Sequence, residues 1–199
     1  MRRAWLAALA IVLAGAVPAA AVQRPNVVII ETDDQTQADM AWMPKTRALI
    51  GAPGTTFPNS VVSLSECCPS RTTLLTGRYA HNHGVLSTHP PFGGWRRIPA
   101  DHTLAVWLQR AGYATALVGK YGNGFGDSEV PPQPPGWTEF HGLLGGGIYS
   151  FFGSRWLSNG IVEEFGERYQ TDLLTDRPAQ FAKPAEHWLA KRSVSRLAA

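Results

Sequence analysis

The sequence has 199 residues, which is enough for one domain with a sizeable hydrophobic core. Hydrophobic residues make up 44% and charged residues 17%, a balance that argues against a disordered chain. The formal net charge is +3, and two of the 18 basic residues, Arg2 and Arg3, sit at the extreme N-terminus. Since the other 16 nearly balance the 15 acidic residues, the composition excludes a strongly basic surface, and we expect no nucleic-acid partner.

Residues 1–21 have the pattern of a secretory signal peptide. The basic start MRR is followed by the apolar run AWLAALAIVLAGAV and then by PAAA, which offers a cleavage site after Ala21. The apolar run is short for a bilayer span, so we expect cleavage and no stable membrane span. The mature protein is therefore predicted to be secreted, or periplasmic or extracellular, in a compartment that permits disulfides.

Helix-like and strand-like segments then follow one another along the chain. A continuous apolar run that ends in acids, at 25–35, is typical of a strand buried on both faces. The other expected elements are a helix at 43–54, an extended segment at 55–62, helices at 69–77 and 103–113, and a strand at 114–120. This alternation predicts an α/β fold with a mainly parallel sheet flanked by helices.

The C-terminal third is less regular. The segment 126–160 is rich in Gly, Pro and aromatic residues and is expected to form loops, with LSNG at 157–160 as a hairpin turn. A helix is expected at 169–182, interrupted by Pro178. Beyond residue 183 the pattern degrades, so we predict an atypical tail over 183–199.

Chemically reactive groups follow the predicted strands. Asp33 and Asp34 end the first strand, Cys67 lies in the next turn, and Lys120 ends the last strand. In α/β folds, ligands bind at the carboxyl ends of strands. Two adjacent carboxylates repel each other, and a hard divalent cation with oxygen ligands would compensate for this. From the two acids alone, a solvated turn is the more frequent explanation.

The stretch SECCPSR holds both cysteines of the chain side by side. A bridge between neighbours closes almost no loop, so structural crosslinking does not explain them. If Pro69 is the first helical residue, Cys67 faces free backbone N–H groups and the positive helix end, which can activate a thiol or hold an anion. The alternative is a purely structural role, with both cysteines buried and inert.

Three stretches together resemble a known family. PNVVIIETDDQ, CCPSRTTLLTGRYAHNHGV and ALVGKYGNGFG, in this order, are similar to the N-terminal portion of a type I sulfatase, most of all the glucosamine-6-sulfatase-like subgroup. The family signature is C-x-P-S-R, so Cys67 matches its cysteine and Cys68 fills the variable position. The resemblance implies an alkaline-phosphatase-like fold and divides the chain into a signal peptide (1–21), a partial sulfatase N-terminal domain (22–182) and the tail (183–199).

The resemblance also implies a chemistry. A separate formylglycine-generating enzyme would oxidise Cys67 to formylglycine, whose hydrated aldehyde attacks the sulfur of a sulfated sugar or related ester; the covalent intermediate then breaks by elimination. Asp33 and Asp34 would bind one Ca²⁺ ion that also touches the residue derived from Cys67. Arg71 would hold the formylglycine hydroxyl and Lys120 the sulfate oxygens.

Two further residues are candidates for substrate binding, and one feature departs from the family. Asn123 fits the subgroup's sequence after the lysine, and His83 lies near the signature. Family members usually run to more than twice this length, and their second half completes the calcium site. The sequence therefore suggests a truncated or frameshifted product and leaves open whether the chain is active by itself.

Other functions stay open on the sequence alone. Phosphonate and phosphodiester hydrolases of the same superfamily can use C-x-P-S-R. A non-catalytic, secreted anion- or glycan-binding remnant would keep Cys67 as a thiol. A vicinal-dithiol redox protein is disfavoured because no C-x-x-C spacing is present.

Overall fold

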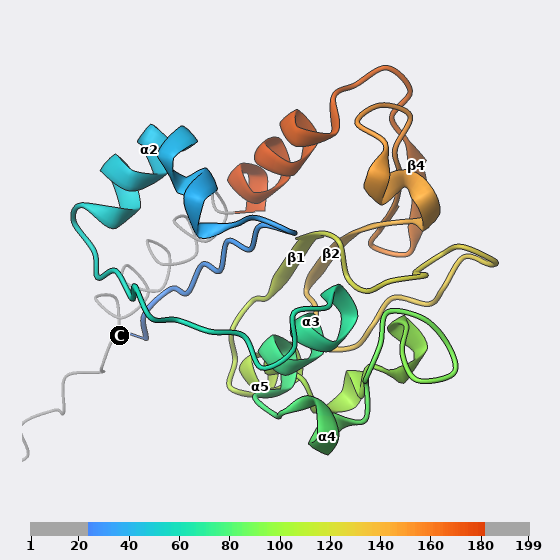
Figure 1. The fold of residues 1–199 in the computed structure, drawn as a ribbon. Coiled ribbons are helices and arrows are strands. Elements are labelled where there is room, and N and C mark those ends of the chain that lie inside the picture. The colour runs from blue at the N-terminus through green and yellow to red at the C-terminus, as the bar shows by residue number, and fades with distance from the viewer. Residues whose placement is uncertain (1–23, 182–199) are drawn as a thin grey trace, which may run out of the picture. The chain divides into compact units, whose positions relative to one another are not determined.

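The computed structural model describes residues 24–181 (Figure 1). The chain divides into two compact units, Met1–Gln35 and Thr36–Ala199, and each is described by itself. The predicted signal peptide and the predicted tail at 183–199 lie outside the described residues. Within residues 24–181, no helix combines the length and the apolar character that crossing a bilayer requires.

The described part of the first unit, residues 24–35, is extended but is not a strand of the described sheet. Its apolar residues are exposed, with 81% of Val28 and 74% of Ile30 accessible to solvent. The expected strand buried on both faces at 25–35 is therefore wrong for the described structure. The segment has the apolar pattern of a strand, but a strand also needs a hydrogen-bonded neighbour, and an apolar pattern does not indicate which segment that neighbour is.

The second unit contains all the regular elements that the structure labels. Its helices are α2 (Pro44–Thr46), α3 (Cys67–Thr76), α4 (Ala80–His83) and α5 (Leu104–Arg110), with a further helix at 170–181. Short 3-10 turns lie at Gln37–Trp42, Trp95–Arg97, Ala100–His102 and Gly145–Tyr149, and a π turn at Arg47–Gly51 extends α2. Its strands are β1 (Ala116–Gly119), β2 (Glu139–Leu143), β3 (Arg155–Ser158) and β4 (Ile161–Glu164).

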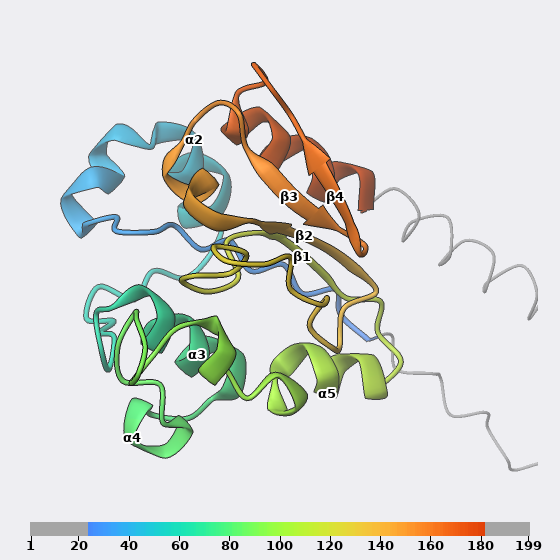
Figure 2. The same ribbon diagram turned by 90° about the vertical axis from the view of Figure 1, so that its right-hand side faces the viewer.

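The four strands form one sheet in the order β1-β2-β3-β4 (Figure 2). β1 and β2 are parallel, whereas β2 with β3 and β3 with β4 are antiparallel. The described sheet is thus mixed, and the expected parallel pairing applies to β1 and β2 only. The β3–β4 hairpin turns at Asn159 and Gly160, both with positive φ, as predicted for 157–160.

Helices cover both faces of this sheet. Phe140 of β2 and Leu157 of β3 belong to a buried cluster with Cys68 of α3. Their neighbours on the opposite face, Leu143 and Trp156, pack with Leu173 of the helix at 170–181. Because side chains alternate across a strand, this split places α3 on one face and the helix at 170–181 on the other. The result is a helix–sheet–helix arrangement, which confirms the predicted α/β class.

Most of the other expected elements are confirmed within a few residues. The predicted helix at 103–113 is α5, which follows extended Thr103 and ends before Gly112 with its φ of 84°. The predicted strand at 114–120 is β1. The segment 55–62 forms no strand among the described residues, and the helix at 170–181 continues through Pro178 where an interruption was expected.

Candidate active site

Helix α3 begins at Cys67, two residues earlier than expected. Glu66 is the extended cap residue, and the Ser70 N–H donates to the Glu66 carbonyl at 2.9 Å. Pro69 is therefore the third helical residue, not the first. A proline is tolerated there because the first N–H groups of a helix have no intrahelical partner. Cys67 itself occupies the first position, next to the positive end of the helix.

The two neighbouring cysteines have different environments. Cys68 is fully buried in the core cluster, whereas Cys67 is half-buried. Cys68, Thr72 and Thr76 recur every four residues and form the buried face of α3, and both threonine hydroxyls donate to the carbonyl one turn earlier at 2.7 Å. No disulfide joins the two cysteines, both of which are described.

Burial raises the pKa of the Cys68 thiol. Backbone N–H groups of Asn123 and Gly94 hydrogen-bond to its sulfur, and the charges of Lys120 and Arg71 act in the same direction, but burial is the larger effect. Cys68 is therefore a packing residue with a protonated thiol near neutral pH. Sequence reasoning treated this position as a tolerated variable one and missed its place in the core, since a variable position in the C-x-P-S-R signature does not indicate burial.

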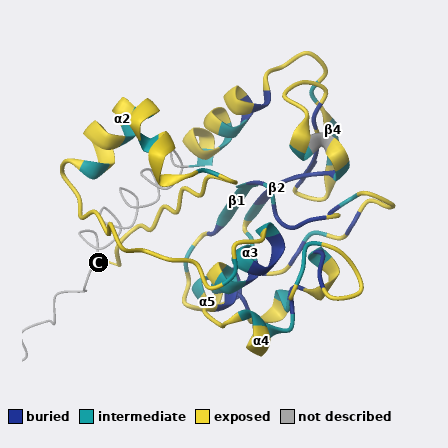
Figure 3. Cartoon of the chain, viewed as in Figure 1, coloured by how far each residue is buried: buried dark blue, intermediate teal, exposed yellow. Residues whose placement is uncertain are grey.

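Arg71 joins the helix to the end of strand β1. Its Nη1 donates to the Lys120 carbonyl at 2.7 Å, across 49 residues of sequence. Arg71 lies one turn after Cys67, so the two share a face of α3, and helical side chains lean toward the N-terminus. The structure thus brings the predicted residues Cys67, Arg71 and Lys120 to one region, because the bond from Arg71 ties the first turns of α3 to the residue that follows β1. Figure 3 shows α3 as partly buried and partly exposed.

Asn123 lies in the loop that follows Lys120. Its backbone carbonyl accepts from the Trp95 N–H at 2.9 Å, which holds the loop in place. Its side chain is buried, and its Oδ1 has no hydrogen-bond partner among residues 24–181. A buried amide oxygen without a partner is costly, so this atom is well suited to accept a ligand hydrogen bond. The assignment of Asn123 to substrate binding stays a prediction.

His83 holds α4 against α3. Its Nδ1 accepts from the Val85 N–H at 3.1 Å, and its Nε2 lies 3.1 Å from the Thr73 hydroxyl. We assign the proton to Nε2 because Nδ1 acts as an acceptor. Burial lowers the pKa of His83, and the charge of His81 lowers it further, against a Pro69 carbonyl that raises it. Both ring nitrogens are thus engaged within the protein, which gives His83 a structural role. Its assignment to substrate binding stays a prediction.

The remaining predicted ligands, Asp33 and Asp34, belong to the first unit. They occupy an exposed bend, and Asp34 has a φ of 56°, in the left-handed region that few residues other than glycine adopt. Two carboxylates on consecutive residues offer hard oxygen donors, which suit calcium by their chemistry. The assignment of Asp33, Asp34 and Cys67 to a metal stays a prediction.

The sulfatase family profile matches residues 25–192. The chain belongs to the sulfatase family. This confirms the family resemblance carried by the CCPSR and GKYGN stretches, and the alkaline-phosphatase-like fold that it implied.

Individual sulfatases show how far the similarity extends. The chain is 40% identical over 164 residues to the extracellular sulfatase Sulf-1 homolog of Caenorhabditis elegans, covering 78% of this chain and 22% of that protein. It is 36% identical over 168 residues to the human N-acetylglucosamine-6-sulfatase, covering 79% and 30% respectively. The chain thus spans less than a third of the length of these sulfatases.

A solved structure extends the similarity to the fold. It contains a protein in complex with its substrate, D-glucosamine-2-N,6-O-disulfate, and it superposes with a TM-score of 0.50 at 25% identity. The match covers 64% of this chain and 23% of that protein. The described sheet and helices are therefore part of a larger sulfatase fold.

Proposed function

We propose that the protein hydrolyses sulfuric esters of sulfated sugars, with a formylglycine derived from Cys67 as its nucleophile. The observation that supports this most is the meeting of Cys67, Arg71 and Lys120, which is fixed by the 2.7 Å bond from Arg71 Nη1 to the Lys120 carbonyl. A nucleophile, a helix N-terminus and two cations in one place suit attack on a tetrahedral anion.

Each of these residues has a separate task. The aldehyde that sulfatases form from their signature cysteine supplies an oxygen nucleophile in place of the thiol. Arg71, anchored on the Lys120 carbonyl, keeps its guanidinium on the Cys67 face of α3 and orients the residue there. The Lys120 ammonium attracts the sulfate oxygens, and the positive end of α3 stabilises negative charge beside Cys67. Asn123 Oδ1 accepts a hydrogen bond from the sugar.

A Ca²⁺ ion would complete this chemistry by neutralising the charge of the sulfate. Asp33 and Asp34 fit such an ion because they offer adjacent carboxylate oxygens on an exposed bend. The left-handed backbone at Asp34 is consistent with this, since unusual φ values cluster at functional sites. The residue derived from Cys67 is the third proposed ligand.

The relatives suggest the substrate class and the location. N-acetylglucosamine-6-sulfatase is a sulfatase of sulfated amino sugars by its name, and the solved neighbour holds a disulfated glucosamine. We accordingly propose a sulfated glycan as substrate and a formylglycine-generating enzyme as the partner in maturation. The extracellular sulfatases of Caenorhabditis elegans and Drosophila melanogaster support secretion.

The test measures sulfate release from an aryl sulfate by the full chain, produced together with the maturation enzyme and supplied with Ca²⁺. Cys67→Ala should abolish release. Lys120→Met should lower kcat/KM by roughly 10²–10³-fold, since it removes one charge from the anion site but keeps the carbonyl that Arg71 binds. Lys45→Met, on exposed α2, is the matched control. Sulfate release that survives in Cys67→Ala would contradict the proposal.

The phosphodiester alternative is tested in the same assay. An aryl phosphodiester offered beside the aryl sulfate reports which anion the site prefers. We expect the sulfate to be the better substrate, and a higher kcat/KM for the phosphodiester would favour the second reaction.

A further inference from the structure

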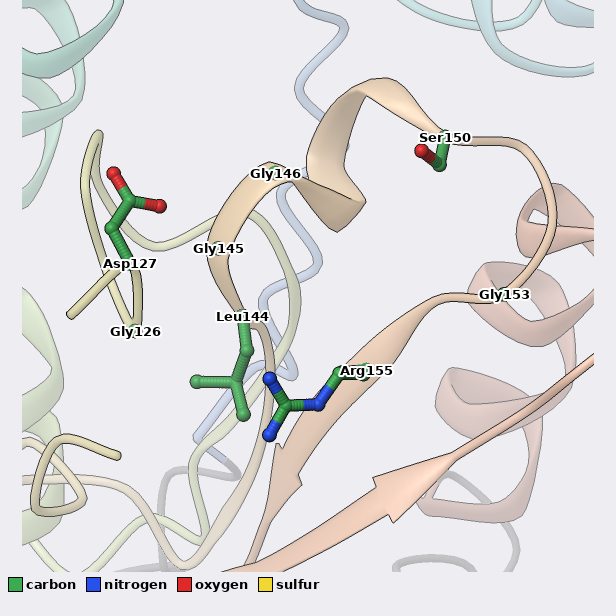
Figure 4. Close-up of a pocket in the computed structure, with 8 residues that line it drawn as sticks. All are labelled: Gly126, Asp127, Leu144, Gly145, Gly146, Ser150, Gly153 and Arg155. Atoms are coloured by element: carbon green, nitrogen blue, oxygen red, sulfur yellow. The ribbon is translucent and has the colours of Figure 1, made fainter. Parts of the chain in front are cut away.

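A polar hollow lies beside the carboxyl end of the sheet, outside the residues assigned above. It has a volume of about 320 Å³ and is bounded by the turn at Gly126 and Asp127, by residues 144–146, which follow β2, and by Arg155 at the start of β3 (Figure 4). The Gly145 N–H donates to the Phe125 carbonyl at 2.7 Å, which ties the first two of these segments together. This backbone hydrogen bond thus joins two walls of the hollow.

The polar groups around the hollow are complementary in kind. Asp127 offers a carboxylate that only accepts hydrogen bonds, Ser150 a hydroxyl that donates and accepts, and Arg155 a guanidinium that only donates. The Arg155 Nε is paired with Glu164 Oε1 at 3.2 Å, and its guanidinium extends toward Leu144 (Figure 4). Such a set of donors and acceptors fits a ligand that carries several hydroxyl groups.

Exposed aromatic residues adjoin Ser150 of the hollow along the chain. Tyr149 and Phe151 stand on either side of Ser150 in the sequence and are 75% and 64% exposed, and neighbouring Phe152 is 58% exposed. Phe151 and Phe152 lie 6.0 and 5.6 Å from the ring of Tyr169, so the three rings form one patch. Exposed aromatic rings that gather in one patch are typical of a binding surface and not of a core.

The hollow is also on the side of the proposed sulfate site. β1 and β2 are parallel, so Lys120 and Leu144 follow them at the same edge of the sheet. The Lys120 Nζ lies 5.9 Å from the centre of the Tyr149 ring, within the range of a cation–π contact. Tyr149 thus contacts Lys120, the cation assigned to the sulfate, and directly precedes Ser150 of the hollow in the sequence.

We propose that this hollow is a sugar subsite that binds a pyranose ring of the substrate next to the reacting sulfate. The ring's hydroxyl groups meet Asp127, Ser150 and Arg155, and the exposed aromatic residues next to Ser150 along the chain offer an apolar surface for the part of the ligand that extends out of the hollow. The inference rests on the proposed function for its choice of substrate and adds the residues that recognise the sugar.

Gly146 allows the hollow to be filled without straining the fold. It lines the hollow, its φ is not in the left-handed region, and a Cβ added there meets no atom within 4 Å. Gly146→Leu therefore places a side chain where the ring would bind. Gly51→Leu is the matched control, since Gly51 has the same open surroundings and ordinary backbone in the π turn after α2.

Asp127→Asn tests the polar contact without changing the shape of the hollow. Its matched control is Glu129→Gln, an exposed acid two residues on that pairs with Arg96. Circular dichroism and thermal melting of each variant check that it is folded.

The experiment measures binding of methyl β-D-glucopyranoside, an unsulfated probe, to the full chain by saturation-transfer NMR and titration. A ligand of this size should bind with a Kd of roughly 1 mM. Gly146→Leu and Asp127→Asn should each weaken binding by about tenfold, and both controls should match the unaltered chain. No binding by the unaltered chain, or equal binding by the folded Gly146→Leu and Asp127→Asn variants, would overturn the inference.

Different results would contradict the proposed function and the proposed subsite. Cys67→Ala should still bind the probe, because Cys67 does not line the hollow. Probe binding without sulfate release in the aryl sulfate assay would count against the proposed function alone. Sulfate release from the aryl sulfate with no effect of either hollow variant on probe binding would count against the subsite alone.

Discussion

Cys67 and Cys68 differ in burial although they are neighbours, and this difference is testable at the scale of single residues. In protein made without the maturation enzyme, iodoacetamide at pH 7.5 should alkylate Cys67 first, since it is half-buried. Cys68 is fully buried with a raised pKa and should react only once urea exposes it. Peptide mapping after timed labelling measures both sites, and equal native rates would contradict the assigned environments.

Residue types at the site could be predicted from the sequence, but several of their contacts could not. The C-x-P-S-R spacing predicted Cys67 as a site residue. The predicted strand at 114–120 placed the charge of Lys120 at the carboxyl edge of the sheet. The bond between Arg71 and the Lys120 carbonyl joins residues 49 apart, and no local pattern records such a pairing. For the same reason the burial of Cys68 among Tyr121, Phe125 and Phe140 was missed.

At the scale of elements, His83 couples the packing of α4 on α3 to pH. Its folded pKa is lowered, so the unfolded chain takes up a proton at higher pH than the folded one. The stability that neutral His83 contributes is complete above its unfolded pKa of about 6.5 and is lost as the pH falls below it. We expect the free energy of unfolding, measured with urea, to decrease between pH 7.5 and pH 5.

Two variants isolate this histidine. His83→Asn keeps an acceptor for the Val85 N–H but does not titrate, so its stability should depend less on pH. His102→Asn removes an exposed histidine and should keep the original dependence. An unchanged pH profile in His83→Asn would show that another group causes the effect.

The contact of the loop before β2 with helix α5 depends on a glycine. Gly136 has a φ of 88°, and a Cβ there would lie 2.5 Å from the Val106 backbone nitrogen. Gly136→Ala should lower the free energy of unfolding by roughly 2–4 kcal/mol, from the left-handed backbone and the overlap together. Gly51→Ala should change it by less than about 0.5 kcal/mol. Equal stability of the two variants in urea would contradict the described packing.

Elements whose ends carry local sequence signals were predicted close to their observed positions. α3, α5 and the β3–β4 hairpin each have a glycine or an Asn-Gly turn at one end. The apolar run at 25–35 has the composition of a buried strand but is exposed in the described structure, because strand pairing depends on a partner elsewhere in the chain. The pairing of β3 with β2 could not be predicted either, since the sequence indicates the hairpin turn but not the strand that lies next to the hairpin in the sheet.

At the scale of the whole molecule, the proposed calcium site is tested by removing one ligand. Terbium luminescence and Ca²⁺ titration of the full chain should show an affinity that falls by about tenfold or more in Asp33→Asn, since a lost charged ligand costs ~1.5–3 kcal/mol. Asp101→Asn, in the exposed 3-10 turn at Ala100–His102, is the control. Equal affinity in Asp33→Asn and the unaltered chain would contradict the assignment.

The central claim is that Cys67, and not Cys68, becomes the nucleophile, and peptide mass spectrometry tests it most directly. The chain is produced with a formylglycine-generating enzyme, alkylated and cut with trypsin, and the peptide that ends at Arg71 is sequenced, with a Pro69→Ala variant as the control that breaks the C-x-P-S-R signature. The account predicts an aldehyde at Cys67 and an alkylated thiol at Cys68 in the unaltered chain, and two alkylated thiols in Pro69→Ala. Two alkylated thiols in the unaltered chain would contradict it.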